Sequence, residues 1–104
     1  MAAIKGSETQ HPGEFEKQLE VTFENIGIML SQVGMDLHVP QPDRRRHFKV
    51  FLRHPEYLDR MNRELETYLQ GRDTFSIVEA DICRADLEVE IELIIFPSDP
   101  TPAQ

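Results

Sequence analysis

The most chemically suggestive part of the chain is residues 87–92, where glutamates alternate with apolar residues. In a strand, this alternation places Glu88, Glu90 and Glu92 on one face, with successive side chains roughly 6–7 Å apart. Like charges at this spacing repel, which favours the protonated form of the most buried carboxyl. A carboxyl that keeps its proton near neutral pH can act as a general acid. The same pattern also fits an edge strand with a solvated acidic outer face.

Length and composition predict one domain and exclude several classes of partner. The chain has 104 residues, 39% of them apolar, and no apolar run approaches the roughly 20 residues of a membrane helix. Its 19 acidic and 11 basic residues give a formal charge of −8, which argues against nucleic acid or an anionic membrane as partner. The single cysteine, Cys83, excludes an internal disulfide. With no signal-peptide pattern, this indicates a reducing cytoplasm.

An anionic ligand would need a local cluster of basic residues, and the sequence offers a few. They are the run Arg44–Arg46, Lys49 together with Arg53, and Arg84. Arg53 and Arg84 are candidates to hold a carboxylate through two hydrogen bonds, although each also fits an ordinary surface arginine. The run Arg44–Arg46 follows a proline-containing loop and is predicted to be a solvated turn.

Hydrophobic periodicity predicts the helices and strands that position these residues, and prolines and glycines mark where those elements begin and end. We expect a flexible lead over residues 1–11, one domain over residues 12–96 and a disordered proline-rich tail over residues 97–104. Within the domain, the pattern predicts a helix from Glu14 to Val33, a strand over 47–52, a helix between Pro55 and Gly71, and strands over 75–80 and 87–96.

This order of elements predicts an α+β fold in which two helices pack on one face of a small mixed sheet. A three-stranded sheet is a narrow platform for a helix of roughly 30 Å, the length of about 20 residues. We therefore expect either that another chain completes the sheet or that a sheet edge is exposed.

Sequence motifs for cofactors and metals are missing. There is no glycine-rich phosphate loop, no Cys-x-x-Cys pair and no His-Glu-x-x-His helix, and the four histidines are scattered. We expect no cofactor and no metal site.

Three segments make the chain resemble the RidA (YjgF) superfamily. They are Thr22–Ile26 in the first helix, Lys49–Leu52 in the first predicted strand, and Val89-Glu90-Ile91-Glu92 in the last. Within that superfamily, the chain is most similar to the C-terminal domain of chorismatases, also called pteridine-dependent dioxygenase-like proteins. The narrower resemblance is carried by residues 8–13, 49–55 and 80–92.

The resemblance implies a RidA- and chorismate-mutase-like fold, in which a layer of helices packs on a sheet, and it implies a specific reaction. Chorismatases hydrolyse the enolpyruvyl ether of chorismate and release pyruvate, so the ligand would be a small aromatic or cyclohexadiene carboxylate. Glu90 matches the general acid of that family. Cys83 matches a residue that lines the pocket and influences the product, and it also fits a small buried core residue.

The chain also departs from the family in three ways. The strands that precede the first long helix in the family are missing, as is the additional domain of the same fold that chorismatases carry, so the chain resembles a C-terminal fragment. RidA deaminases hold the substrate carboxylate with an arginine at the position of Phe75, which puts imine or enamine deamination in doubt.

Two further interpretations of the resemblance therefore remain. The chain could be a non-catalytic RidA-like module that oligomerises and binds a small carboxylate. It could also be a RidA-type enamine or imine deaminase, which Phe75 disfavours. RidA proteins form trimers with sites between subunits, so we expect a homo-oligomer, most simply a trimer.

Overall fold

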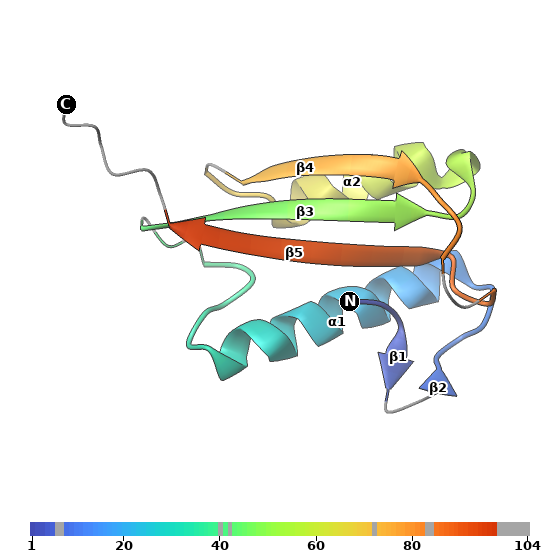
Figure 1. Ribbon diagram of the computed structural model, residues 1–104, viewed down its shortest axis with the longest axis horizontal. Helices are drawn as coiled ribbons and strands as arrows, with labels where there is room; N and C mark the ends of the chain where they lie inside the picture. The colour runs from blue at the N-terminus through green and yellow to red at the C-terminus, as the bar shows by residue number, and fades with distance from the viewer. Residues whose placement is uncertain (6–7, 40, 42, 72, 83–84, 98–104) are drawn as a thin grey trace.

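The computed structural model describes residues 1–5, 8–39, 41, 43–71, 73–82 and 85–97. The described elements are a short hairpin, two helices, one 3₁₀ turn and three longer strands (Figure 1). In chain order they are β1 (Ile4–Lys5), β2 (Glu8–Thr9), α1 (Phe15–Gln32), β3 (Arg44–Leu52), η1 (Pro55–Tyr57), α2 (Leu58–Tyr68), β4 (Thr74–Glu79) and β5 (Val89–Pro97). Both predicted helices and all three predicted strands are confirmed, with small shifts at their ends.

Helix α1 forms because apolar residues recur every three or four positions along it. Phe15, Leu19, Phe23, Ile26 and Leu30 are all buried, so one stripe of the helix faces the core. The helix ends at the predicted place, where Gly34 adopts a left-handed φ of 75°. This conformation is inexpensive for glycine and lets the following residues bond back to the last turn of the helix.

The three long strands form a mixed sheet in the order β4-β3-β5. Strand β3 runs parallel to β4 and antiparallel to β5. A parallel pair needs a crossover connection, and η1 with α2 supplies it between β3 and β4. This arrangement confirms the α+β fold class with a small mixed sheet.

The two faces of this sheet differ in burial. Alternate residues of β3 point into the core, among them Phe48, Val50 and Leu52, and they pack with α1, α2 and β5. The opposite face is formed by the intervening residues of the three strands and is only partly covered. We call this second surface the open face of the sheet. By strand register, it carries Arg45, His47, Lys49, Phe51, Ser76, Val78, Glu90, Glu92, Ile94 and Phe96.

The prediction of a flexible lead over residues 1–11 is wrong for the described part of that segment. Strands β1 and β2 form an antiparallel hairpin, and Ala3 is fully buried in a small cluster with Ala2, Ile82 and Leu87. Asn25 of α1 donates hydrogen bonds to the carbonyls of Ala2 and Ile4. The lead is therefore fixed by long-range contacts that its own short and mixed sequence does not encode. The predicted tail lies outside the described residues except for Pro97, which ends β5.

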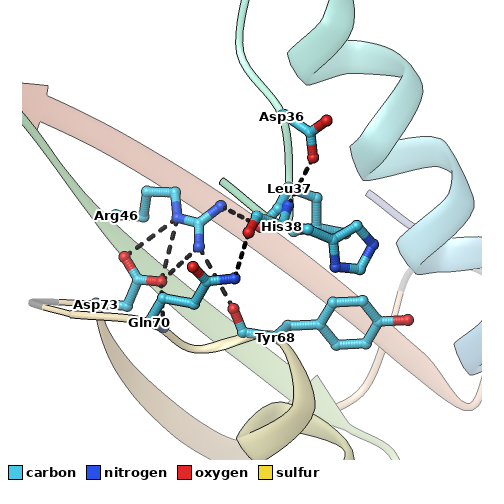
Figure 2. Close-up of polar contacts among 7 residues, drawn as sticks. All are labelled: Asp36, Leu37, His38, Arg46, Tyr68, Gln70 and Asp73. Carbon is cyan, nitrogen blue, oxygen red and sulfur yellow. Dashed lines mark hydrogen bonds and ion pairs between the residues drawn. The ribbon is translucent and has the colours of Figure 1, made fainter. Parts of the chain in front are cut away.

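The prediction of a solvated turn over Arg44–Arg46 is also wrong, because these residues begin β3. Arg46 is only 4% exposed, and its guanidinium bonds both carboxylate oxygens of Asp73, with Nη2 2.5 Å from Oδ2. The same guanidinium donates to the carbonyls of Leu37 and Tyr68 (Figure 2). One buried arginine thereby ties the loop before β3, the end of α2 and the turn before β4 to the sheet.

Candidate functional site

Glu90 lies on the open face of the sheet, at the second position of β5. Its register partner on β3 is Phe51, and the next pair on the same face is Glu92 with Lys49. Cross-strand neighbours of this kind bring Cβ atoms to about 5 Å, so two carboxylates, an ammonium and an aromatic ring share one small area. The Lys49 ammonium lies 5.3 Å from the centre of the Phe51 ring. This group of side chains can contact a ring that carries a carboxylate.

The N-terminal residues lie along the free edge of β5 next to Glu90. The N–H of Ile91 donates to the Met1 carbonyl at 2.7 Å, the Met1 amino group donates to the Ile91 carbonyl, and Ala2 forms a bridge with Glu90. Burial lowers the pKa of the Met1 amino group, and the nearby carboxylates of Glu90 and Glu92 oppose this shift. Glu90 therefore lies beside a partly buried amine.

A groove of about 690 Å³ opens at this edge between β5 and α1. Besides Glu90 it is lined by Met1, Ile4, Ile28 and Met29, among others, so its walls are mainly apolar. Glu90 is the one acidic side chain among the described residues that line it. An apolar groove with a single carboxyl has the composition expected for a small organic ligand.

Glu88 does not join Glu90 and Glu92 in an exposed row, as the alternation predicted. It precedes β5 and is only 7% exposed, and its Oε1 lies 3.4 Å from Nε2 of His54. The predicted set of three carboxylates is thus reduced to two within the strand, and the third lies against the half-exposed imidazole of His54.

Gln18 positions the start of β5, and the sequence analysis did not identify it. This side chain is completely buried. Its Nε2 donates to the carbonyls of His11 and Asp86, at 3.0 and 2.8 Å, and its Oε1 accepts from the N–H of Glu88. Both donor hydrogens of the amide and one of the two acceptor positions on its oxygen are thus in use, linking α1 to the segment that carries Glu90. The available signal was a polar residue within the apolar stripe of a helix.

Of the other predicted site residues, the structure places Arg53 close to the same segment. Its Nε donates to the Leu87 carbonyl at 2.8 Å and its Nη2 to the Ile82 carbonyl at 3.0 Å. Arg53 therefore holds the loop between β4 and β5 against the end of β3. Cys83 and Arg84, predicted in that loop, lie outside the described residues. Phe75 lies on β4 and is partly exposed, so no charged side chain occupies its position.

The described residues form neither a metal-ion site nor a membrane-spanning helix. Among them, no group of three or more histidine, cysteine, aspartate or glutamate side chains is arranged to bind a metal ion. No helix in the described part of the chain is long and apolar enough to cross a membrane.

Comparisons with proteins of known sequence point in one direction. The chain is 33% identical over 101 residues to a chorismatase of Streptomyces rapamycinicus, which covers 90% of this chain and 29% of that protein. It is 28% identical over 99 residues to a 3-hydroxybenzoate synthase of Streptomyces hygroscopicus, covering 91% of this chain and 29% of that protein. The chain thus spans less than a third of the curated relatives it matches. No model of a known protein family matches the chain.

Solved structures give a consistent result. A crystal structure of a chorismatase superposes with a TM-score of 0.67 at 31% identity, covering 89% of this chain and 30% of that one. The YjgF gene product of E. coli superposes with a TM-score of 0.65 at 19% identity, covering 84% of this chain and 67% of that one. At this low identity, the second likeness concerns the fold alone.

Proposed function

We propose that this chain, which has the YjgF/RidA-like fold and is a distant homologue of chorismatases and 3-hydroxybenzoate synthase, is a chorismatase-like domain with Glu90 as its general acid. The observation that carries the proposal is the likeness to chorismatases over nine-tenths of the chain, including the strand with Glu90. The chain spans only 29% of that relative. That this chain shares the activity of the whole relative is therefore proposed here and does not follow from the likeness alone.

The proposed reaction is hydrolysis of the enolpyruvyl ether of chorismate. Glu90 transfers its proton to the terminal methylene carbon, and the ether oxygen stabilises the resulting cation. Water or a neighbouring hydroxyl group adds to the cationic carbon, and the bond between that carbon and the ring oxygen breaks. When water adds, the products are pyruvate and a ring alcohol, and the carboxylate regains its proton from solvent. Protonation of carbon is slow, so a positioned carboxylic acid is the group that this step requires.

The placement of Glu90 supports this role. It borders an apolar groove and is held in the second position of a strand whose start is fixed by Gln18. We assign Cys83 to the substrate pocket on the resemblance that suggested it, and Arg84 on the ability of a guanidinium to hold a carboxylate through two hydrogen bonds. For Arg53 the contacts favour a positioning role, since two of its nitrogens hold the loop that carries those residues.

The open face of the sheet supports self-association, and we propose a homotrimer of this chain in the cytoplasm. Ile94 is 40% exposed on this face, and Val78 and Phe96 add further apolar surface. Apolar side chains exposed on one face of a sheet can form part of a protein interface. A second copy packed here would cover Phe51 and Glu90 and could supply the wall that the groove lacks.

The second candidate function is a non-catalytic module that oligomerises and binds a small carboxylate. The specific observation in its favour is the same exposed apolar surface, because covering it in an oligomer does not depend on any chemistry. An enamine or imine deaminase is a weaker candidate, since Phe75 offers no charge to a substrate carboxylate.

The experiment that separates these candidates combines assembly with turnover. The purified protein is sized by mass-resolved gel filtration, and the main fraction is incubated with chorismate while proton NMR follows the enolpyruvyl and pyruvate methyl signals. Appearance of pyruvate together with one ring product supports the chorismatase-like domain. Saturable line broadening of 3-hydroxybenzoate by an oligomer that leaves chorismate intact supports the binding module and contradicts catalysis.

A further inference from the structure

A second concave site lies on the other side of α1 and shares none of the residues that line the groove at Glu90. It is a cleft of about 390 Å³ between α1, the loop before β3 and the end of α2. Phe23 and Gly27 of α1, His38 of the loop and Tyr68 of α2 are among its lining residues. Figure 2 shows His38 and Tyr68 lying beside each other at this position.

Aromatic rings form one wall of the cleft. The rings of Phe23 and Tyr68 stack with centroids 4.0 Å apart and an interplanar angle of 9°. The His38 ring lies 5.5 Å from that of Tyr68, tilted by 31°. Burial raises the pKa of Tyr68, and the charges of Glu64 and Glu20 add to the shift. Tyr68 therefore stays neutral in the physiological range and presents a flat, mostly apolar surface.

The wall is held in position by the buried arginine network described above. Arg46 bonds the carbonyls of Leu37 and Tyr68, on either side of the cleft. Gln70 adds a bond from its Nε2 to the His38 carbonyl at 2.6 Å (Figure 2). Both sides of the cleft are thus held by hydrogen bonds to Arg46, so binding a ligand would cost little conformational entropy in the cleft.

Gly27 leaves the floor of the cleft open. It lies in the middle of α1, where glycine is among the least favourable residues. Packing does not require it, because a Cβ added there would meet no atom within 4 Å. The effect of having glycine here is to keep free the space that a larger side chain would fill.

The charge around this space is negative. Glu20, Glu24 and Asp36 line it, and no lysine or arginine appears among the described lining residues. Glu24 is already paired with Lys5, at 2.6 Å, and Asp36 accepts the N–H of His38. Glu20 forms no ion pair with another described residue, so it is the carboxylate most available to a ligand. The overall charge of −8 adds long-range attraction for cations.

We infer that this cleft binds an organic cation, an ammonium or guanidinium group, whose apolar part lies against Tyr68 and His38 above Gly27 and whose charge faces Glu20. The cation comes either from a small molecule or from a lysine or arginine side chain of a protein partner, because the recognising chemistry is the same.

The test uses benzylamine as the small probe and N-acetyl-arginine amide as the side-chain probe, each titrated into the full chain and followed by amide NMR. Benzyl alcohol and N-acetyl-citrulline amide are the uncharged counterparts. We expect saturable shifts confined to residues around Gly27, His38 and Tyr68, and no saturation with the uncharged compounds. Tighter binding of the arginine compound assigns the cleft to a protein partner, and tighter binding of benzylamine assigns it to a small molecule.

Two variants separate binding from folding. Gly27→Leu fills the floor with a good helix former, so it should abolish saturation while leaving the fold intact. Glu20→Gln should weaken binding roughly fivefold, the range of a partly exposed charge contact, whereas Glu66→Gln, the same change on an exposed part of α2, should not. Wild-type affinity in the folded Gly27→Leu variant, equal binding of the uncharged compounds, or shifts spread over the whole surface would overturn the inference.

Discussion

The side-chain Oε1 of Gln18 accepts a hydrogen bond of 2.7 Å from the backbone N–H of Glu88. These residues are 70 positions apart, and the bond joins the first turns of α1 to the segment that leads into β5. Because Glu90 follows two residues later, the position of the proposed acid depends on an amide that takes no part in the chemistry.

Replacing Gln18 by methionine should destabilise the protein by about 2–3 kcal/mol. The change keeps the length of the side chain but leaves the N–H of Glu88 and the carbonyl of Asp86 buried without this partner, and each lost bond costs about 1 kcal/mol or more. Urea unfolding followed by circular dichroism measures the effect. Gln32→Met, an exposed change on the same helix, is the control. Equal midpoints for the two variants would show that the buried amide is not needed.

The sequence predicts the regular elements well because each has a strong period. Residues 15–30 repeat every three to four positions and β5 alternates, and burial against the core enforces both patterns. The features it fails to predict depend on contacts between distant residues. Gln18 looks like an interruption of an apolar stripe until its partners at 86 and 88 are known.

Arg46 shows that the burial of a charged residue is equally hard to predict from sequence. Three successive arginines resemble a solvated turn. The pairing with Asp73, 27 residues later, and the bonds to the carbonyls of Leu37 and Tyr68 explain why the third is buried in a strand. For the candidate site, the sequence and the resemblance identify Glu90, whereas the groove beside it depends on where the N-terminal residues lie along β5.

Asp73→Asn should destabilise the protein by about 3–5 kcal/mol, the usual effect of breaking a buried ion pair. The variant retains the shape of the side chain but leaves the Arg46 guanidinium without its counter-charge in a site where it is only 4% exposed. Urea unfolding is again the measurement. Asp43→Asn, on an exposed aspartate that makes a long surface contact with Arg44, should change stability by less than ~1 kcal/mol. A similarly small effect at Asp73 would contradict the role given to the Arg46 network.

Tyr68 should ionise above the ordinary tyrosine pKa of 10.0, because burial and the charges of Glu64 and Glu20 raise its pKa. The chain has two tyrosines and no tryptophan, so absorbance at 295 nm in a Tyr57→Phe variant reports Tyr68 alone. As the pH rises past 10, the unfolded chain loses this proton before the folded one. The stabilising contribution is therefore complete below the unfolded pKa and is lost as pH rises through the folded pKa.

Adding Glu20→Gln should move the Tyr68 midpoint down towards 10, since it removes one of the three causes of the shift. A Tyr68 midpoint at or below 10 in the folded protein would contradict the environment described for the cleft.

Ile94→Lys should convert the oligomer into a monomer. The change places a charge on the open face of the sheet, where burial at an interface would leave it unpaired. Mass-resolved gel filtration gives the oligomeric state, and circular dichroism checks that the fold is kept. Leu58→Lys, a matched change at an exposed leucine of α2, should leave the oligomer unchanged. Dissociation by the second variant and not the first would place the interface on the helical side.

The most direct test of the proposed function is the rate of pyruvate release from chorismate by the wild-type protein and by Glu90→Gln at the same oligomeric state. The amide keeps the size of the side chain but has no proton to give to carbon, so the account predicts a loss of at least roughly 100-fold, the lower end of what a general acid contributes. Glu66→Gln should retain the full rate. Pyruvate release that is equal in Glu90→Gln and wild type, or undetectable in a well-folded wild-type oligomer, would contradict the assignment of Glu90 as the acid of a chorismatase-like site.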